Sequence, residues 1–289
     1  MSMQPGLLRQ GPEKPAGQPV SSQAPPSRGQ PAAIRADHVS LVMTAGAGGD
    51  PPKEILRDIT LSVGRGEVVS LIGPSGCGKT TFLNTVAGLE EGYEGSLEVL
   101  GDRPSAGRAE VGYAMSRDAL LPWRTASRNV ELGLEARKMA KKERRELARD
   151  ALERVGLGDH LDSYRAQLSQ GMRQRVALAR TLVGNPSLLL LDEPFAALDA
   201  QTRVLMQEHL ARVLTEYRGA VLLVTHDIPE AIVMSDRVLV FSQRPAHVSK
   251  EFTVDVPRPR SIVKMRSSSA FASLQDRIWS ELAQGEEGR

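Results

Sequence analysis

The chain has 289 residues, of which 40% are hydrophobic and 25% are charged, an ordinary globular composition with enough apolar residues for a sizeable core. Its 37 basic and 35 acidic residues nearly balance, which excludes a global field of one sign that recruits nucleic acid or an anionic membrane. The single cysteine, Cys77, excludes an internal disulfide. No apolar run reaches the roughly 18 residues that span a bilayer, and the N-terminus lacks a signal-peptide pattern.

The N-terminal segment differs in composition from the rest of the chain. Residues 1–33 are rich in Pro, Gly, Gln and Ser and contain few apolar side chains, so we expect a disordered leader there. The folded part is expected to begin with a strand at 34–43. A loop rich in Gly and Pro separates this strand from a second one near 59–63.

Continuous apolar runs then alternate with helical patterns. Strands are predicted at 68–72, 188–191 and 220–225, and helices at 80–87, 171–183 and 201–217. Apolar strands that alternate with helices in this way indicate a parallel sheet buried on both faces, and therefore an α/β fold.

A long helical pattern interrupts this alternation between about residues 120 and 167. Basic residues cluster at 141–145, but Glu143 and Glu146 interrupt the cluster. A solvated helix face explains such a pattern better than a nucleic-acid site, so we predict no nucleic-acid partner.

A glycine-rich segment follows the strand at 68–72 and has the spacing G-x-x-x-x-G-K-[ST]. Its glycines let successive backbone N–H groups point at phosphates, and the following helix presents its positive end to them. Lys79 supplies a charge for the β and γ phosphates, and Thr80 a hydroxyl for Mg²⁺. A chance glycine-rich turn is the alternative, but the flanking strand and helix argue against it. The predicted nucleotide-binding residues are Gly73, Pro74, Ser75, Gly76, Cys77, Gly78, Lys79, Thr80 and Thr81.

Two carboxylates follow the apolar run at 188–191 directly. Ligands of a parallel sheet bind at the carboxyl ends of its strands. Asp192 is therefore predicted to hold Mg²⁺ together with Thr80, and Glu193 to face an attacking water. An acidic strand end can also be a solvent-facing turn, but the phosphate loop makes that alternative weak.

Three further segments resemble motifs of ABC ATPases. Residues 168–175, Leu-Ser-Gln-Gly-Met-Arg-Gln-Arg, resemble the signature motif; residues 196–199 resemble the D-loop and residues 224–227 the switch-histidine segment. They occur in the family's order and spacing, and the resemblance covers about 34–241. It implies a P-loop NTPase core of ABC ATPase type, with an inserted helical subdomain and an N-terminal antiparallel β region.

The resemblance also implies domain boundaries. We expect the ATPase domain at 34–245, with its helical subdomain at about 112–168. The remaining residues, 246–289, are expected to form a C-terminal tail with a short helix near 271–282.

The resemblance further implies an ATPase that works as a homodimer. ATP with Mg²⁺, held by the phosphate loop of one chain, would be covered by Ser169 and Gly171 of the other, with Asp199 also at the nucleotide. Glu193 and His226 are the implied catalytic residues, with His226 at the γ-phosphate.

Three positions depart from the family's pattern. Gln170 stands where the signature motif has glycine, Ser116 stands where the Q-loop has glutamine, and no aromatic residue lies near Val42 and Met43 to stack on adenine. A serine hydroxyl is too short to reproduce the reach of a glutamine side chain. Either these changes are tolerated or they slow the ATPase.

The segment Leu120-Leu121-Pro122-Trp123 resembles that of the nitrate, sulfonate and taurine importers. This resemblance implies an ATP-binding subunit at the cytoplasmic face of the cell membrane, bound peripherally through permease subunits that dock near 120–123. An extracytoplasmic solute-binding protein is implied as an indirect partner. The alternative is a soluble ABC ATPase that acts on nucleic acid or ribosomes, or a partly degenerate subunit.

Overall fold

The computed structural model of the chain describes residues 32–43, 51–116, 118–196, 198–256, 260 and 265–287. Two sheets organise this part of the chain, one with strand order β2-β1-β4 and one with order β5-β6-β7-β3-β8-β9. The leader expected at 1–33 lies outside the described residues except for its last two, which begin β1.

The smaller sheet is antiparallel and contains the first two strands of the described chain. It consists of β1 (Ala32–Met43), β2 (Lys53–Gly64) and β4 (Glu94–Val99), and β1 pairs with both neighbours in antiparallel register. Apolar residues of β1 such as Ile34 and Leu41 are buried, whereas Met43 is exposed. The expected antiparallel β region is thereby confirmed.

The larger sheet supplies the frame of the predicted α/β core. Its strands are β3 (Val68–Ile72), β5 (Val111–Ala114), β6 (Leu188–Asp192), β7 (Ala220–Val224), β8 (Arg237–Phe241) and β9 (Val248–Thr253). All pairings are parallel except that of β9 with β8. Every residue of β3, β6 and β7 is buried, because both faces of the sheet are covered.

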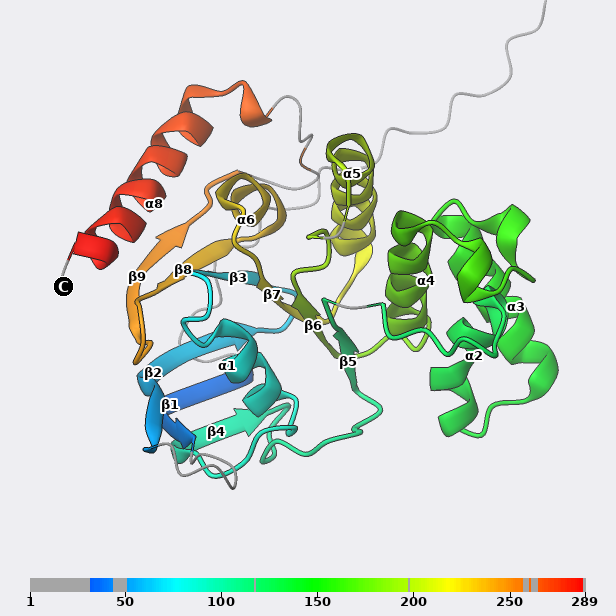
Figure 1. Cartoon of the computed structure of the whole chain (residues 1–289), viewed down its shortest axis with the longest axis horizontal. Coiled ribbons are helices and arrows are strands. Elements are labelled where there is room, and N and C mark those ends of the chain that lie inside the picture. Colours follow the sequence, from blue (N-terminus) through cyan, green and yellow to red (C-terminus); the bar gives the residue numbers. More distant parts are fainter. Residues whose placement is uncertain are drawn as a thin grey trace, which may run out of the picture.

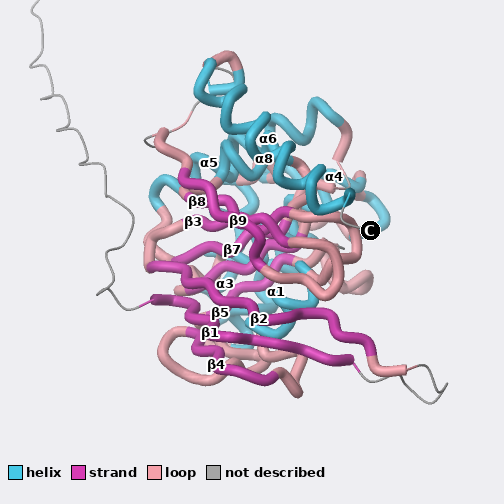
Figure 2. The backbone as a smooth tube through the Cα atoms, turned by 90° about the vertical axis from the view of Figure 1, so that its left-hand side faces the viewer, coloured by secondary structure: helices cyan, strands magenta, loops and turns pink. Residues whose placement is uncertain are grey.

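Helices and the small sheet cover the two faces. Figure 2 shows α1 (Lys79–Val86) and the small sheet on one side, with α5 (Ala200–Glu216), α6 (Ile228–Met234) and α8 (Ser269–Glu287) on the other. Phe82 of α1 belongs to the core on the first side, while Leu210 of α5 and Ile278 of α8 belong to the core on the second. The C-terminal helix is longer than the range of 271–282 expected from the sequence.

A separate group of helices lies beyond β5 at one end of the molecule (Figure 1). It contains α2 (Ala126–Ala136), α3 (Lys141–Arg154) and α4 (Gln170–Leu182), with short 3₁₀ turns η1 (Gly158–His160) and η2 (Arg165–Gln167) between α3 and α4. These helices pack around their own apolar core. The group differs from the expected range of 112–168, because β5 belongs to the large sheet and α4 packs against α2 and α3. In the described part of the chain, no helix is both long and apolar enough to cross a membrane.

Candidate nucleotide site

The phosphate-binding loop predicted from the sequence connects β3 to α1. Gly76 and Gly78 have φ angles of 73° and 131°, a backbone conformation that side chains with a Cβ rarely adopt. At Gly73 a Cβ would lie 2.7 Å from the carbonyl oxygen of Phe241. Turn geometry and close approach to β8 therefore both require the glycines that the sequence pattern supplies.

Lys79 begins α1 and folds back over the loop. Its Nζ donates hydrogen bonds to the carbonyl oxygens of Gly73 at 2.8 Å and Pro74 at 2.9 Å. The Lys79 side chain is buried, as is Cys77, whose backbone N–H also donates to Pro74. Ser75 and Gly76, at the tip of the loop, are exposed. A buried ammonium therefore lies directly under a glycine-rich loop that is open to solvent, which is an arrangement suited to binding an anion.

Thr80 and Asp192 meet across the space between α1 and β6. The Thr80 Oγ1 donates to the Asp192 Oδ1 at 2.9 Å. Burial raises the pKa of Asp192 and the nearby Glu193 raises it further, while Thr80 and Lys79 act in the opposite direction. A hydroxyl and a carboxylate beside a phosphate cradle are hard oxygen ligands of the kind Mg²⁺ prefers, so these two residues fit the predicted metal role.

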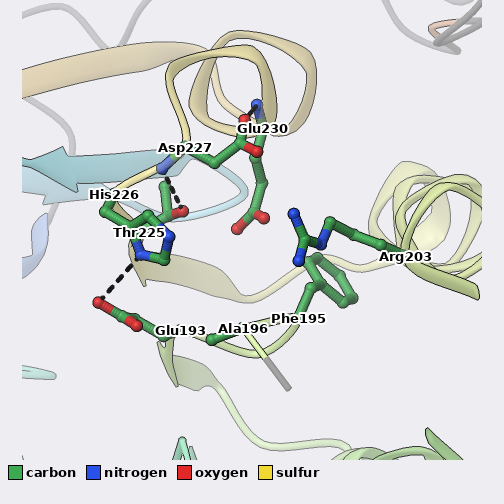
Figure 3. A pocket seen from close by; sticks show the side chains of 8 residues that line it. All are labelled: Glu193, Phe195, Ala196, Arg203, Thr225, His226, Asp227 and Glu230. Carbon is green, nitrogen blue, oxygen red and sulfur yellow. Dashed lines mark hydrogen bonds and ion pairs between the residues drawn. The ribbon is translucent and has the colours of Figure 1, made fainter. Parts of the chain in front are cut away.

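Glu193 and His226 lie at the carboxyl ends of the neighbouring strands β6 and β7 (Figure 3). Nδ1 of His226 is 3.4 Å from Oε1 of Glu193, and both side chains are partly exposed. The Glu193 backbone has a φ of 46° and its N–H donates to the Val224 carbonyl at 2.9 Å. The strand end thus turns sharply, and the carboxylate is directed toward the histidine.

The sequence reasoning missed several polar residues around this pair. The pocket that contains Glu193 and His226 is also lined by Arg203, Thr225 and Glu230, and Figure 3 shows the Glu230 carboxylate facing the Arg203 side chain. Burial, followed by the charge of Asp227, raises the pKa of Glu230 to about 8. The available sequence signal was an acidic residue four positions after the histidine, in the first turn of an otherwise apolar helix.

Tyr113 was also missed. It lies in β5, next to β6, and its hydroxyl donates to Oδ1 of Asn84 at 2.7 Å. Burial raises the pKa of Tyr113 and the charge of Asp192 adds to this effect. A neutral tyrosine therefore borders the carboxylate proposed to hold Mg²⁺.

Ser169, Gly171 and Asp199 lie apart from the phosphate loop. Ser169 and Asp199 cap α4 and α5, since their side chains accept hydrogen bonds from the backbone N–H groups of Met172 and Thr202. A Cβ on Gly171 would lie 3.2 Å from Cγ2 of Thr202, so the starts of the two helices are neighbours. Figure 1 shows α4 on the far side of β5 from α1. Within one chain, the predicted site is thus divided between two surfaces.

The departures from the family's pattern lie at exposed positions. Ser116, just after β5, and Gln170, the first residue of α4, are both exposed. Val42 is 50% and Met43 40% exposed at the end of β1. Arg117 and Ala197, in the predicted Q-loop and D-loop segments, lie outside the described residues.

Comparisons with known proteins are consistent with this geometry. The sequence model of the ABC transporter family matches residues 56–196. An uncharacterised ABC transporter ATP-binding protein of Bacillus subtilis, YtlC, is 43% identical over 232 residues, which are 78% of this chain and 88% of that protein. The aliphatic sulfonates import ATP-binding protein SsuB 1 of Burkholderia lata is 43% identical over 236 residues, which are 82% of this chain and 70% of that protein.

Solved structures show the same fold. The ATP-binding cassette MJ0796, in a dimeric post-hydrolysis state with ADP and Pi, aligns with a TM-score of 0.68 and 29% identity. The alignment covers 77% of this chain and 99% of that one.

Proposed function

Because this chain belongs to the ABC transporter family as an ATP-binding ATPase subunit, we propose that it binds MgATP on the loop at 73–78 and that Glu193 activates the water that attacks the γ-phosphate. The observation that carries this proposal is the convergence of Lys79, Thr80, Asp192 and Glu193 at the carboxyl ends of β3 and β6. Phosphoryl transfer depends chiefly on positioning and charge neutralisation, and these side chains provide both.

Each residue has a distinct part in this proposal. The backbone of 73–78 and the side chain of Lys79 hold the phosphates, with Thr81 on the first turn of α1 beside them. Thr80 and Asp192 hold Mg²⁺, which when bound neutralises charge on the β and γ phosphates. Glu193 accepts a proton from the attacking water, and His226, 3.4 Å from that carboxylate, contacts the γ-phosphate.

We propose further that two copies of the chain complete each site. Ser169 and Gly171 lie at the start of α4, where the helix dipole favours an anion, and Asp199 lies at the neighbouring start of α5. Their separation from the chain's own phosphate loop is explained if they cover the nucleotide of a second chain. The dimeric state of the similar cassette MJ0796 supports this assembly.

The partner implied for the segment 120–123 is a membrane permease. Trp123 is 72% exposed in the segment 120–123, and an aromatic side chain at the surface is a frequent anchor in protein interfaces. We place the ATPase domain at 34–245 and the surface that docks the permease at the segment 120–123. The docked subunit would lie at the cytoplasmic face of the membrane. The sulfonate importer among the similar proteins supports a small anionic solute such as nitrate, sulfonate or taurine, delivered by a solute-binding protein.

The metal-site part of this proposal is tested by nucleotide titration with and without Mg²⁺. The wild type is expected to bind ATP more tightly with Mg²⁺ than with a chelator, and Thr80→Val should remove most of that difference. Thr85→Val is the matched control, because Thr85 lies on the same helix and its hydroxyl donates to the Thr81 carbonyl instead. An unchanged Mg²⁺ effect in Thr80→Val would contradict the assignment.

A further inference from the structure

Asp118 lies between β5 and α2 and is held by side chains that come from much later in the sequence. Its Oδ1 accepts from the Nε of Arg165 at 3.1 Å, and its Oδ2 accepts from the Nε of Arg173 at 3.0 Å. The backbone N–H of Leu120 also donates to Oδ1 at 3.2 Å. Only 13% of the Asp118 side chain is exposed, so this carboxylate is well enclosed by its partners.

Arg173 continues the connection to the start of α4. Its Nη1 donates to the carbonyl oxygen of Leu168 at 2.9 Å, and Leu168 directly precedes Ser169, the N-cap of α4. A single arginine side chain therefore joins the Asp118 carboxylate to the backbone that orients Ser169.

A second arginine of the same helix fixes the backbone of the same loop. Arg180 donates from Nη1 to the Ala119 carbonyl at 2.9 Å and from Nη2 to the Asp118 carbonyl at 3.1 Å. Seven residues, or about two helical turns, separate Arg180 from Arg173. Two points along α4 thus hold one loop, which restricts rotation of the helix relative to it.

The other end of the loop leads into the segment 120–123. Asn129, which is 1% exposed, accepts from the Leu121 N–H at 2.8 Å and donates to the carbonyl oxygens of Leu121 and Arg124. The segment is therefore bonded directly to α2, and the two residues that precede it, Asp118 and Ala119, are bonded to α4. Displacement of this segment requires displacement of α4 or the loss of several of these hydrogen bonds.

A purely stabilising role is the alternative explanation of this network. Burial raises the pKa of Asp118, but hydrogen bonds from Arg165 and from the Leu120 N–H outweigh it, so that the pKa is lowered. The carboxylate is therefore charged at neutral pH and adds some stability. Stability alone does not require that one partner, Arg173, also bind the carbonyl next to Ser169.

We propose that Asp118 is a positioning residue, which through Arg173 sets the orientation of Ser169 and Gly171 toward the nucleotide of a second chain and couples that orientation to the segment 120–123. This inference rests on the composite site proposed above. The connection from the docking segment to the nucleotide then runs through α4.

The test uses Glu193→Gln, which is expected to form an MgATP-dependent dimer because hydrolysis is blocked. Asp118→Asn is added in this background, and Asp150→Asn, at an exposed position of α3 in the same helical group, is the matched control. Sedimentation at a series of protein concentrations gives the dimer dissociation constant. Titration with ATP under conditions where the chain is monomeric gives the nucleotide affinity, and thermal melting reports the fold.

We expect Asp118→Asn to weaken MgATP-dependent dimerisation at least tenfold and to change the nucleotide affinity of the monomer less than twofold. The control should leave both unchanged. Arg173→Lys keeps the positive charge but cannot join Asp118 to Leu168 through a planar guanidinium. It should therefore weaken dimerisation similarly, and the double variant should be little worse than either single one.

The possible failures are distinguishable. If Glu193→Gln does not dimerise with MgATP, the composite site proposed above is wrong and this inference falls with it. Equal dimerisation with and without Asp118→Asn would overturn the positioning role alone. If Asp118→Asn weakens dimerisation and also lowers the nucleotide affinity of the monomer or greatly lowers the melting temperature, Asp118 only stabilises the fold.

Discussion

Glu193→Gln separates the catalytic role of Glu193 from its contribution to binding. The substitution preserves side-chain size, and the backbone contact from the Glu193 N–H to the Val224 carbonyl does not depend on the side chain. The substitution changes the contact with Nδ1 of His226, whose side chain is 61% exposed, and it removes a charge that raises the pKa of Asp192. A pair as exposed as this contributes about 1 kcal/mol at most, which corresponds to roughly a fivefold change in affinity.

The loss of a general base has a much larger effect. Positioned bases contribute about 10²- to 10⁴-fold to rate, or roughly 3–5 kcal/mol of barrier. We therefore expect kcat to fall at least about a hundredfold while the dissociation constant for MgATP changes less than about fivefold. Phosphate release under steady-state conditions gives kcat, and calorimetric titration gives the affinity. A kcat within tenfold of wild type would refute the assignment of Glu193 as base.

Three further predictions concern other residues of the site. Lys79→Ala removes the buried cation under the phosphate loop. It should weaken MgATP binding roughly 10- to 150-fold, since hydrogen bonds to charged groups contribute about 1.5–3 kcal/mol. Unchanged affinity in calorimetry would contradict the role of the loop. If the serine side chain at position 116 misplaces the metal and the water, Ser116→Gln should raise kcat with little effect on binding. Misplacement by about 1 Å costs on the order of a hundredfold in rate. Equal ATPase rates of the wild type and the variant, measured with the permease present, would mean that serine is tolerated at this position. Burial raises the pKa of Glu230 from its ordinary value of 4.5 to about 8 in the folded state. The unfolded chain therefore releases this proton at lower pH than the folded chain. The stability that protonated Glu230 contributes is lost as the pH rises between these values, by up to about 1.4 kcal/mol per pH unit. The stability of Glu230→Gln relative to wild type should therefore increase with pH in urea unfolding between pH 5.5 and 8, and parallel pH profiles would show that Glu230 does not titrate there.

The parts of the fold that could be predicted from the sequence are those with strong local signals. The buried strands β3, β6 and β7 are continuous apolar runs, and their positions agree with the predicted ones within about one residue. The phosphate loop was equally clear, because its glycine spacing is required by the backbone angles at Gly76 and Gly78.

Elements with weak local signals were missed. Strand β5 has only four residues, Val-Gly-Tyr-Ala, and is defined by its pairing with β6. Strand β4 has mostly exposed residues, and its only buried ones, Leu97 and Val99, are too few to reveal a period. The boundary of the helical group was also inexact, since α4 joins it only through tertiary packing against α2 and α3.

Most contacts between distant residues could not be predicted from one sequence. Asp118 binds Arg165 and Arg173, which follow it by 47 and 55 residues, and no local pattern connects these positions. Thr80 and Asp192, 112 residues apart, are hydrogen-bonded, and the sequence places both at the same edge of the predicted parallel sheet; their shared metal role stays a prediction. The long-range contacts that a sequence can reveal are therefore those between residues at the same edge of a predicted sheet.

The dependence of ATPase activity on protein concentration tests most directly whether two chains form each site. We expect the specific activity of the wild type to rise with concentration and then level off, as monomers associate. Ser169→Asp keeps an N-cap for α4 but places a negative charge where the proposal puts the γ-phosphate of a second chain. It should bind MgATP as well as wild type and hydrolyse it slowly at every concentration. A specific activity that is constant over the whole range and unaffected by Ser169→Asp would contradict the composite site.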